Sequence, residues 1–248
     1  MNRTLLILLM AGMSAISPFA IQCLPPTAPF VRQDFDVSVS TAQWSVSLFT
    51  LTLAIAMLAY GPLTDRYRRK TLLFSGLTLF CVGSALSAVA PNMAVLLIAR
   101  VLQGIGAAAG SVIARAFATK WFKADELPEV FGYVNMAIVM APMFAPLVIG
   151  LAIDAGGWRA AMWLMCGIGF LMIAVMAYIL RPQGAAASSM GETAAQPASP
   201  LQALSHLFTH APFIQYLSMS GVMQIGMFAF MAGAPFILVD ILGPVSYT

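Results

Sequence analysis

The segment 93–117 has the most distinctive chemistry of the sequence, because it places charge in an apolar run. Arg100, Gln103 and Arg115 interrupt a stretch made mostly of aliphatic and small side chains. On a helix, Gly104 lies about 40° and Arg115 about 60° from Arg100, so these residues share one face. An arginine in a membrane costs from about 3 to more than 10 kcal/mol unless it faces a polar cavity or a partner. We predict that Arg100, Gln103, Gly104 and Arg115 line a pathway; the alternative is an Arg100 that reaches the membrane surface along its aliphatic stem.

A second candidate lies in the basic stretch 61–70, which joins two apolar segments. Asp65 stands beside Arg66, Arg69 and Lys70, and Gly61 precedes it by one helical turn. A carboxylate among cations at a helix end suits a charge relay across a helix interface, and glycine permits close approach of two backbones. We predict a charge relay of this kind at these five residues. For the basic residues alone, the alternative is the excess of Lys and Arg that cytoplasmic loops carry.

Prolines mark the segment 131–153. Pro142, Pro146 and Gly150 recur every four residues, so they lie near one another on a helix, and each proline removes a backbone hydrogen bond. We predict that they bend this helix. Amide side chains in apolar segments need polar partners. We therefore expect Gln22, Asn135 and Gln224 to face a central cavity.

The composition defines the setting for these residues. Of the 248 residues, 60% are hydrophobic and 8% are charged, whereas soluble domains carry about 25% charged residues. The mean hydropathy is +0.89. These values exclude a soluble enzyme with an ordinary surface, a disordered chain and a small disulfide-rich domain. Apolar stretches long enough to cross a bilayer lie at 4–24, 43–63, 71–90, 93–117, 131–153, 159–180 and 212–239.

The order of these stretches predicts the domain organisation. We expect an all-α polytopic membrane protein with a six-helix bundle at 1–181, a cytoplasmic linker rich in Ala, Ser, Pro and Gly at 182–211, and a seventh helix within 212–248. A cytoplasmic N-terminus places nine Lys and Arg residues inside and two outside, in agreement with the positive-inside rule. The inner residues are Arg3, Arg66, Arg68, Arg69, Lys70, Arg115, Lys120, Lys123 and Arg181, and the outer ones are Arg32 and Arg159.

Two groups of small residues predict packing rather than chemistry. Gly106 and Gly110 form a G-x-x-x-G pair, which favours close contact with a neighbouring helix. Cys23, Cys81 and Cys166 all lie in apolar segments, and no pair has the spacing of a metal or redox motif. We expect the cysteines to be small buried hydrophobic side chains.

The basic stretch at 61–70 resembles the cytoplasmic loop motif of the major facilitator superfamily, G-x-L-x-D-R-x-G-R-K/R. Arg68 replaces the second glycine of that motif. The run Arg100-Val101-Leu102-Gln103-Gly104 is similar to the R-x-x-Q-G motif of the same superfamily. The resemblance implies twelve helices in two six-helix halves, a substrate site between them, and a latch in which Asp65 and Arg69 have the main role. The matching loop residues are Gly61, Leu63, Asp65, Arg66, Arg69 and Lys70.

Other motifs resemble the drug:proton antiporters of the bicyclomycin and chloramphenicol resistance type. Pro142, Pro146 and Gly150 match their antiporter motif, and Leu24-Pro25 matches the end of their first helix, D-M-Y-L-P-A-L-P. The aspartate of that group falls on Ile21, and all nine acidic residues lie outside the expected mid-membrane stretches. The resemblance implies export of apolar or amphipathic drug-like molecules across the bacterial inner membrane by alternating access. Exchange for protons is implied by the family alone.

The helix count is compatible with more than one function. One half, a linker and one further helix predict a chain truncated from twelve helices, which would be a fragment that inserts but does not transport. Export of another small metabolite, or a half-transporter that dimerises, also agrees with the sequence. We expect no enzymatic activity, no catalytic residues, no cofactor, no metal and no nucleic-acid partner, because the sequence has no motif for them.

Overall fold

The computed structural model describes residues 3–179, 211–223 and 225–226. The chain divides into two compact units, Met1–Gly191 and Glu192–Thr248. In the second unit, residues 211–223 are helical, within the region expected to hold the seventh helix. The remainder of that predicted helix, with Gln224, and the predicted linker up to residue 210 lie outside the described residues.

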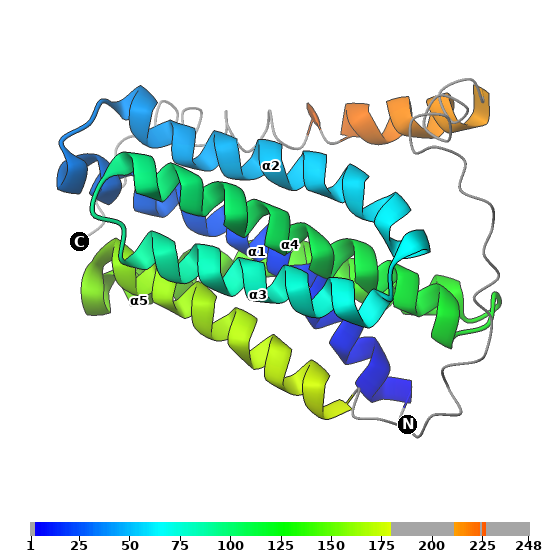
Figure 1. Ribbon diagram of the computed structural model, residues 1–248. Helices are drawn as coiled ribbons and strands as arrows, with labels where there is room; N and C mark the ends of the chain where they lie inside the picture. Colours follow the sequence, from blue (N-terminus) through cyan, green and yellow to red (C-terminus); the bar gives the residue numbers. More distant parts are fainter. Residues whose placement is uncertain (1–2, 180–210, 224, 227–248) are drawn as a thin grey trace. The chain divides into compact units, whose positions relative to one another are not determined.

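Long helices build the described part of the first unit (Figure 1). Each is long and apolar enough to cross a membrane. The backbone of the last one leaves helical geometry at Gly156 and Gly157 and folds back, so its two arms, 127–155 and 158–179, are separate helices. The predicted all-α polytopic fold is confirmed, and each of the first six predicted stretches overlaps one helix or arm. The helices are α1 (Arg3–Phe35), α2 (Val39–Arg66), α3 (Arg69–Ala88), α4 (Met93–Trp121) and α5 (Leu127–Ile179).

The prediction that the first helix ends at residue 24 is wrong. α1 continues to Phe35 with four prolines inside it. Leu24, Thr27 and Val31 are buried in this part, and the Thr27 hydroxyl donates a hydrogen bond of 2.8 Å to the Leu24 carbonyl. Neighbouring helices and hydroxyl side chains make proline tolerable in membrane helices. Packing against the bundle therefore overrides the local stop signal.

Two polar side chains fix where helices begin at one end of the bundle. The Ser38 hydroxyl accepts a hydrogen bond of 3.1 Å from the Thr41 N–H at the start of α2. Asn92 Oδ1 accepts one of 3.0 Å from the Val95 N–H at the start of α4. Both satisfy backbone donors that a helix leaves free in its first turn. The Asn92 cap begins the helix that holds Arg100.

α4 is the helix around which the bundle packs, since it contacts α1, α2 and α3. Glycines make these contacts close. A Cβ at Gly104 would lie 2.8 Å from the Phe49 carbonyl of α2, and one at Gly106 would lie 2.3 Å from the Phe80 nitrogen of α3. One at Gly110 would lie 2.6 Å from the Met13 carbonyl of α1. The packing predicted for Gly106 and Gly110 is confirmed, but the two glycines contact different helices.

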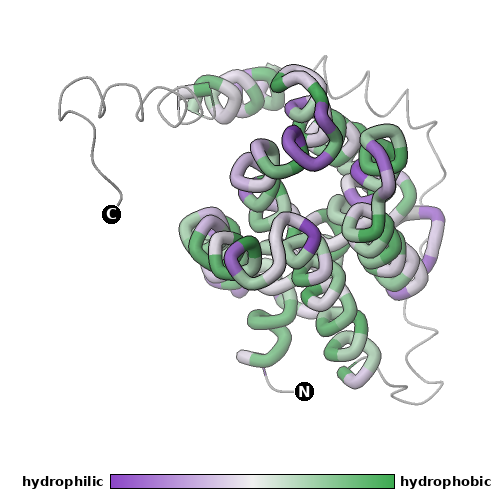
Figure 2. The backbone as a smooth tube through the Cα atoms, turned by 90° about the vertical axis from the view of Figure 1, so that its left-hand side faces the viewer, coloured by the Kyte–Doolittle hydropathy of each residue, from purple (hydrophilic) through white to green (hydrophobic). Residues whose placement is uncertain are grey.

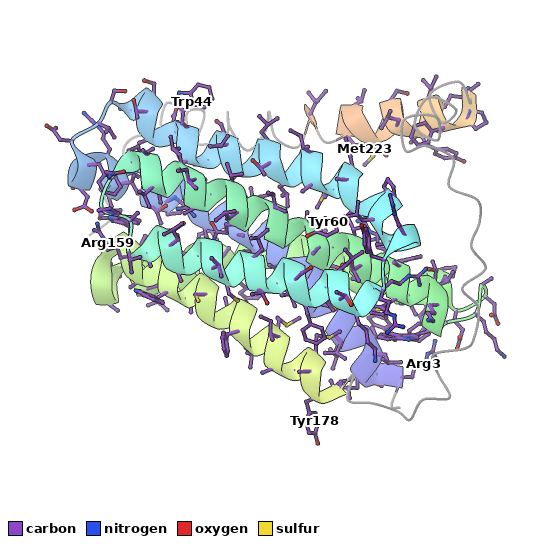
Figure 3. All side chains as sticks on the ribbon, viewed as in Figure 1. Arg3, Trp44, Tyr60, Arg159, Tyr178 and Met223 are labelled. Carbon is purple, nitrogen blue, oxygen red and sulfur yellow. The ribbon has the colours of Figure 1, made fainter. Side chains whose placement is uncertain are left out.

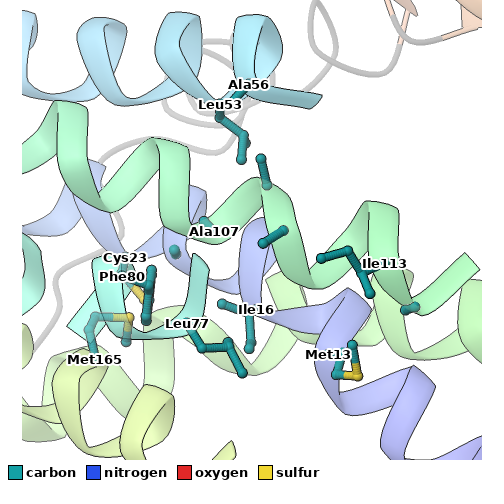
Figure 4. Close-up of a cluster of buried hydrophobic side chains, with 14 of the residues drawn as sticks. Met13, Ile16, Cys23, Leu53, Ala56, Leu77, Phe80, Ala107, Ile113 and Met165 are labelled. Atoms are coloured by element: carbon teal, nitrogen blue, oxygen red, sulfur yellow. The ribbon is translucent and has the colours of Figure 1, made fainter. Parts of the chain in front are cut away.

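Hydrophobic side chains fill the space between these helices and also cover much of their outer faces. Figure 4 shows Ile16 of α1, Phe80 of α3 and Met165 of α5 within one cluster of buried hydrophobic side chains. Hydrophobic colours dominate the helices in Figure 2. Large apolar side chains such as Leu58 and Tyr178 are exposed. An apolar exterior around an apolar core is expected of a bundle whose solvent is lipid.

Candidate functional site

Arg100 and Gln103 form a buried polar pair inside the first unit. Their exposed fractions are 0% and 1%. Arg100 Nη1 donates a hydrogen bond of 2.7 Å to Gln103 Oε1, and Gln103 Nε2 donates one of 2.8 Å to Ser84 Oγ on α3. The Ser84 hydroxyl donates in turn to the Phe80 carbonyl at 2.7 Å. This chain of bonds fixes the rotation of α4 against α3 and orients one edge of the guanidinium.

The rest of the Arg100 guanidinium has no hydrogen-bond partner in the described structure. Nε and Nη2 are buried and unpaired. The described acidic side chains lie at or near helix ends, and none of them bonds to Arg100. They are Asp34, Asp36, Asp125, Glu126, Glu129 and Asp154.

The predicted pathway face of α4 is covered in this unit rather than open. Gly104 is packed against α2. Ser111 of that face bonds to α1, since its hydroxyl lies 3.0 Å from the Ser17 hydroxyl. Arg115 is exposed, whereas Arg100 is buried. A pathway lined by the four predicted residues stays a prediction, because the helical wheel could not show which neighbours cover their face.

The latch residues lie around the connection between α2 and α3. Arg69 Nη1 donates a hydrogen bond of 2.6 Å to the Ala116 carbonyl near the end of α4. Arg66 and Lys70 are exposed, and the side chain of Asp65 lies outside the described residues. A Cβ at Gly61 would meet nothing within 4 Å, so the close approach predicted there is absent from the described structure. The structure thus ties Arg69 to α4.

The prolines of α5 do not interrupt its first arm. In α5 the departures from helical geometry are at Gly156 and Gly157, beyond Pro142 and Pro146. The sharp turn of α5 thus lies at the two glycines, and the milder bend expected at the prolines stays a prediction. Pro146 and Asn135 are exposed, and Pro142 and Gly150 are half-buried. Gln22 on α1 is also half-buried.

A polar cluster at one end of the first unit has no counterpart in the sequence predictions. Asp34 Oδ2 accepts hydrogen bonds from Trp158 Nε1, at 3.2 Å, and from Arg159 Nη1, and Arg159 Nη2 donates one of 3.2 Å to the Ala90 carbonyl. The cluster joins α1, the turn inside α5 and the loop before α4. At the opposite end, Arg3 Nη2 lies 2.6 Å from Glu129 Oε2. Figure 3 labels Arg3 and Arg159 at the two ends. The adjacent Gly156 and Gly157 could have indicated a turn beside Trp158 and Arg159. Nothing in the sequence indicates that Asp34, more than a hundred residues earlier, bonds to them.

These features define a class of protein: a multi-pass α-helical membrane protein with a buried arginine–glutamine pair, Arg100 and Gln103, between its helices. The family model described as Major Facilitator Superfamily matches residues 10–245 of this chain. The chain belongs to the Major Facilitator Superfamily.

Individual relatives agree with this assignment. The chain is 29% identical to the transporter YdgK of Bacillus subtilis over 98% of its own length and 60% of the relative. It is 27% identical to Multidrug resistance protein D of Escherichia coli, over 67% of this chain and 43% of the relative. It is 24% identical to a Bicyclomycin resistance protein homolog of Haemophilus influenzae, over 70% of this chain and 44% of the relative. The chain thus spans 60% or less of the length of these relatives.

A solved structure supports the same fold. The crystal structure of the peptide transporter POT in complex with sulfate superposes with a TM-score of 0.65 at 16% identity. The match covers 98% of this chain and 46% of that one.

Proposed function

We propose that this chain is the first half, with part of the second, of an exporter of apolar or amphipathic drug-like molecules in the bacterial inner membrane. Two relatives have names that refer to multidrug and bicyclomycin resistance, and they align with about two thirds of this chain. The single structural observation in favour is the buried Arg100–Gln103 pair, because an intramembrane charge is costly and marks a transport pathway. The proposed branch is the bicyclomycin and chloramphenicol resistance type.

The proposed mechanism is alternating access, in which two half-bundles rock about a site at their interface. The first bundle comprises residues 1–181, a cytoplasmic linker follows at 182–211, and the second bundle begins within 212–248. The N-terminus lies in the cytoplasm, as the distribution of Lys and Arg favours. Gly61, Asp65, Arg66, Arg69 and Lys70 form the latch at this cytoplasmic side. The hydrogen bond from Arg69 to Ala116 supports a role there, since it joins the loop to the pathway helix.

The substrate route is proposed to run along the exposed face of the first α5 arm. Asn135 and Pro146 lie exposed on this arm, together with Met136 and Met143. Flexible methionine side chains adapt to varied apolar ligands. Gln22 and Gln224 would supply further amides, and Pro142 and Gly150 complete the antiporter motif.

Protons are the proposed coupling ion. The described carboxylates lie at or near helix ends, so exchange would depend on the Arg100 site or on residues beyond those described. Transport that persists after the pH gradient is collapsed with nigericin would exclude this coupling without excluding export.

The test is ethidium efflux from bacteria that lack their main exporters. The chain is expressed as given and, separately, within the longest reading frame that contains it. We expect efflux from the longer product and its loss in Arg100→Ala, while Arg32→Ala, a change at an exposed outer residue, keeps it. Asp65→Asn should change resistance through the latch. Ethidium retention equal to empty vector for every product, at matched membrane abundance, would overturn the proposal; efflux by the chain alone would favour a self-sufficient or dimeric half.

A further inference from the structure

Two of the three cysteines meet between helices that are far apart in the sequence. Cys81 lies on α3 and Cys166 on the second arm of α5. The Cys81 Sγ–H donates a hydrogen bond of 3.7 Å to the Cys166 carbonyl. Both are free thiols in the structure. No sequence motif signals this pair, because 85 positions separate its members.

The helices approach each other closely at this point. Gly169 lies one turn after Cys166, on the same side of the arm. A Cβ at Gly169 would lie 2.6 Å from Cys81 Sγ and 2.9 Å from the Phe80 ring, so a larger residue would push the arm away from α3. A disulfide needs Cα atoms about 4.4–6.8 Å apart, a spacing that helices reach only where small residues allow it. The absence of a side chain at Gly169 therefore lets the arm pack closely on α3 beside the two cysteines.

The pair is partly open to a small reagent through Cys166. Cys166 is half-buried and Cys81 is buried beside it. Each lies about two helical turns, or roughly 11 Å, from its helix end, hence within the apolar layer. Cys23 has an exposed fraction of 0% and lies on α1, which makes it an internal control.

We propose that Cys81 and Cys166 form an oxidisable dithiol site that closes to an intramolecular disulfide between α3 and α5. Closure forms one S–S bond, breaks two S–H bonds and releases two protons and two electrons. The oxidant is a membrane-permeant two-electron acceptor; with a diazene such as diamide, the N=N group takes up both protons and both electrons and becomes a hydrazine. A thiol reductant reverses the reaction.

Closure would link two helices of the same bundle. It would restrict the unfolded chain through the long loop between the two cysteines, so it should raise the melting temperature. Since both helices lie within one unit, the bridge should leave movements between transporter halves unaffected. The disulfide would thus stabilise the first bundle under oxidising conditions.

The experiment treats the purified full chain with diamide in mild detergent and counts free thiols. We expect the count to fall from three to one, with recovery after dithiothreitol. Proteolysis without reduction should give one linked pair, the peptides that contain Cys81 and Cys166. Cys23→Ser should leave this linked pair intact, while Cys166→Ala should abolish it and remove the rise in melting temperature.

A bifunctional methanethiosulfonate with a two-carbon spacer provides the second arm. Linkage by this reagent but not by diamide would show that the thiols are near but cannot bond, and would overturn the proposal. A linked pair that includes Cys23, a bridge only between two chains, or no bridge with either reagent would also overturn it.

Discussion

Arg100 Nη1 lies 2.7 Å from Gln103 Oε1, and this hydrogen bond is buried inside the first compact unit. Gln103 is thus both the acceptor for a buried cation and a donor to Ser84. Its loss would remove the described acceptor of a buried cation on α4 and one of the two hydrogen bonds of the Ser84 hydroxyl on α3. The consequences can be measured without knowledge of the substrate.

Gln103→Leu should destabilise the bundle by about 2–3 kcal/mol, because buried groups that lose a partner bear the full desolvation penalty. Gln103→Glu should be at least as stable as the parent, since its carboxylate keeps an acceptor beside Arg100 and balances the charge. Thermal unfolding in detergent, followed by tryptophan fluorescence, compares the three proteins. Equal melting temperatures for the Leu and Glu variants would contradict the assigned role of this bond.

Gly106→Ala should cost about 3 kcal/mol, because its Cβ would lie 2.3 Å from a backbone nitrogen of α3, which cannot rotate away. Gly132→Ala is the matched control. A Cβ at Gly132 meets nothing within 4 Å, so this change should be neutral or stabilising by up to about 1 kcal/mol. If both variants melt at the same temperature, the close packing of α4 on α3 is not as described.

Gly157→Ala should cost about 1–3 kcal/mol for a reason unrelated to space. The φ angle of Gly157 is 71° with ψ −172°, a conformation that side chains with a Cβ disfavour. Gly167→Ala, in the helical second arm with nothing within 4 Å, should be neutral or slightly stabilising. The measurement is again the melting temperature, and a neutral Gly157→Ala would show that the turn can adopt another conformation.

Arg69→Gln should lower stability by about 1.5 kcal/mol, because the Ala116 carbonyl loses a charged donor at 2.6 Å. Arg68→Gln, at the exposed neighbouring position, should change stability by less than about 0.5 kcal/mol. Chemical unfolding of both variants under the same conditions gives the comparison. Equal free energies of unfolding for the two variants would show that the Arg69 hydrogen bond contributes little to stability.

The helices could be predicted from the sequence because a membrane-spanning helix is a long apolar run. The error at α1 shows the limit of this rule. Pro25 and its neighbours are strong local stop signals in water, yet the buried side chains of Leu24 and Val31 keep the helix intact. A local pattern contains no information about the packing that decides such a case.

Contacts between distant segments were beyond prediction for a related reason. The spacing of Arg100 and Gln103 on one helix shows that they can meet, but their link to Ser84 depends on how α3 and α4 are rotated against each other. The same holds for Asp34 with Arg159 and for Cys81 with Cys166. The order of helices in a bundle determines these pairs, and no spacing along one helix reveals it.

The two glycines inside α5 also affect how the protein is made. Since the arms at 127–155 and 158–179 are joined by Gly156 and Gly157 alone, they would leave the translocon as one helical hairpin. Insertion of such a pair carries only the short turn, with Arg159 beside it, across the bilayer. A change that prevents one arm from inserting should therefore also displace the other during biosynthesis.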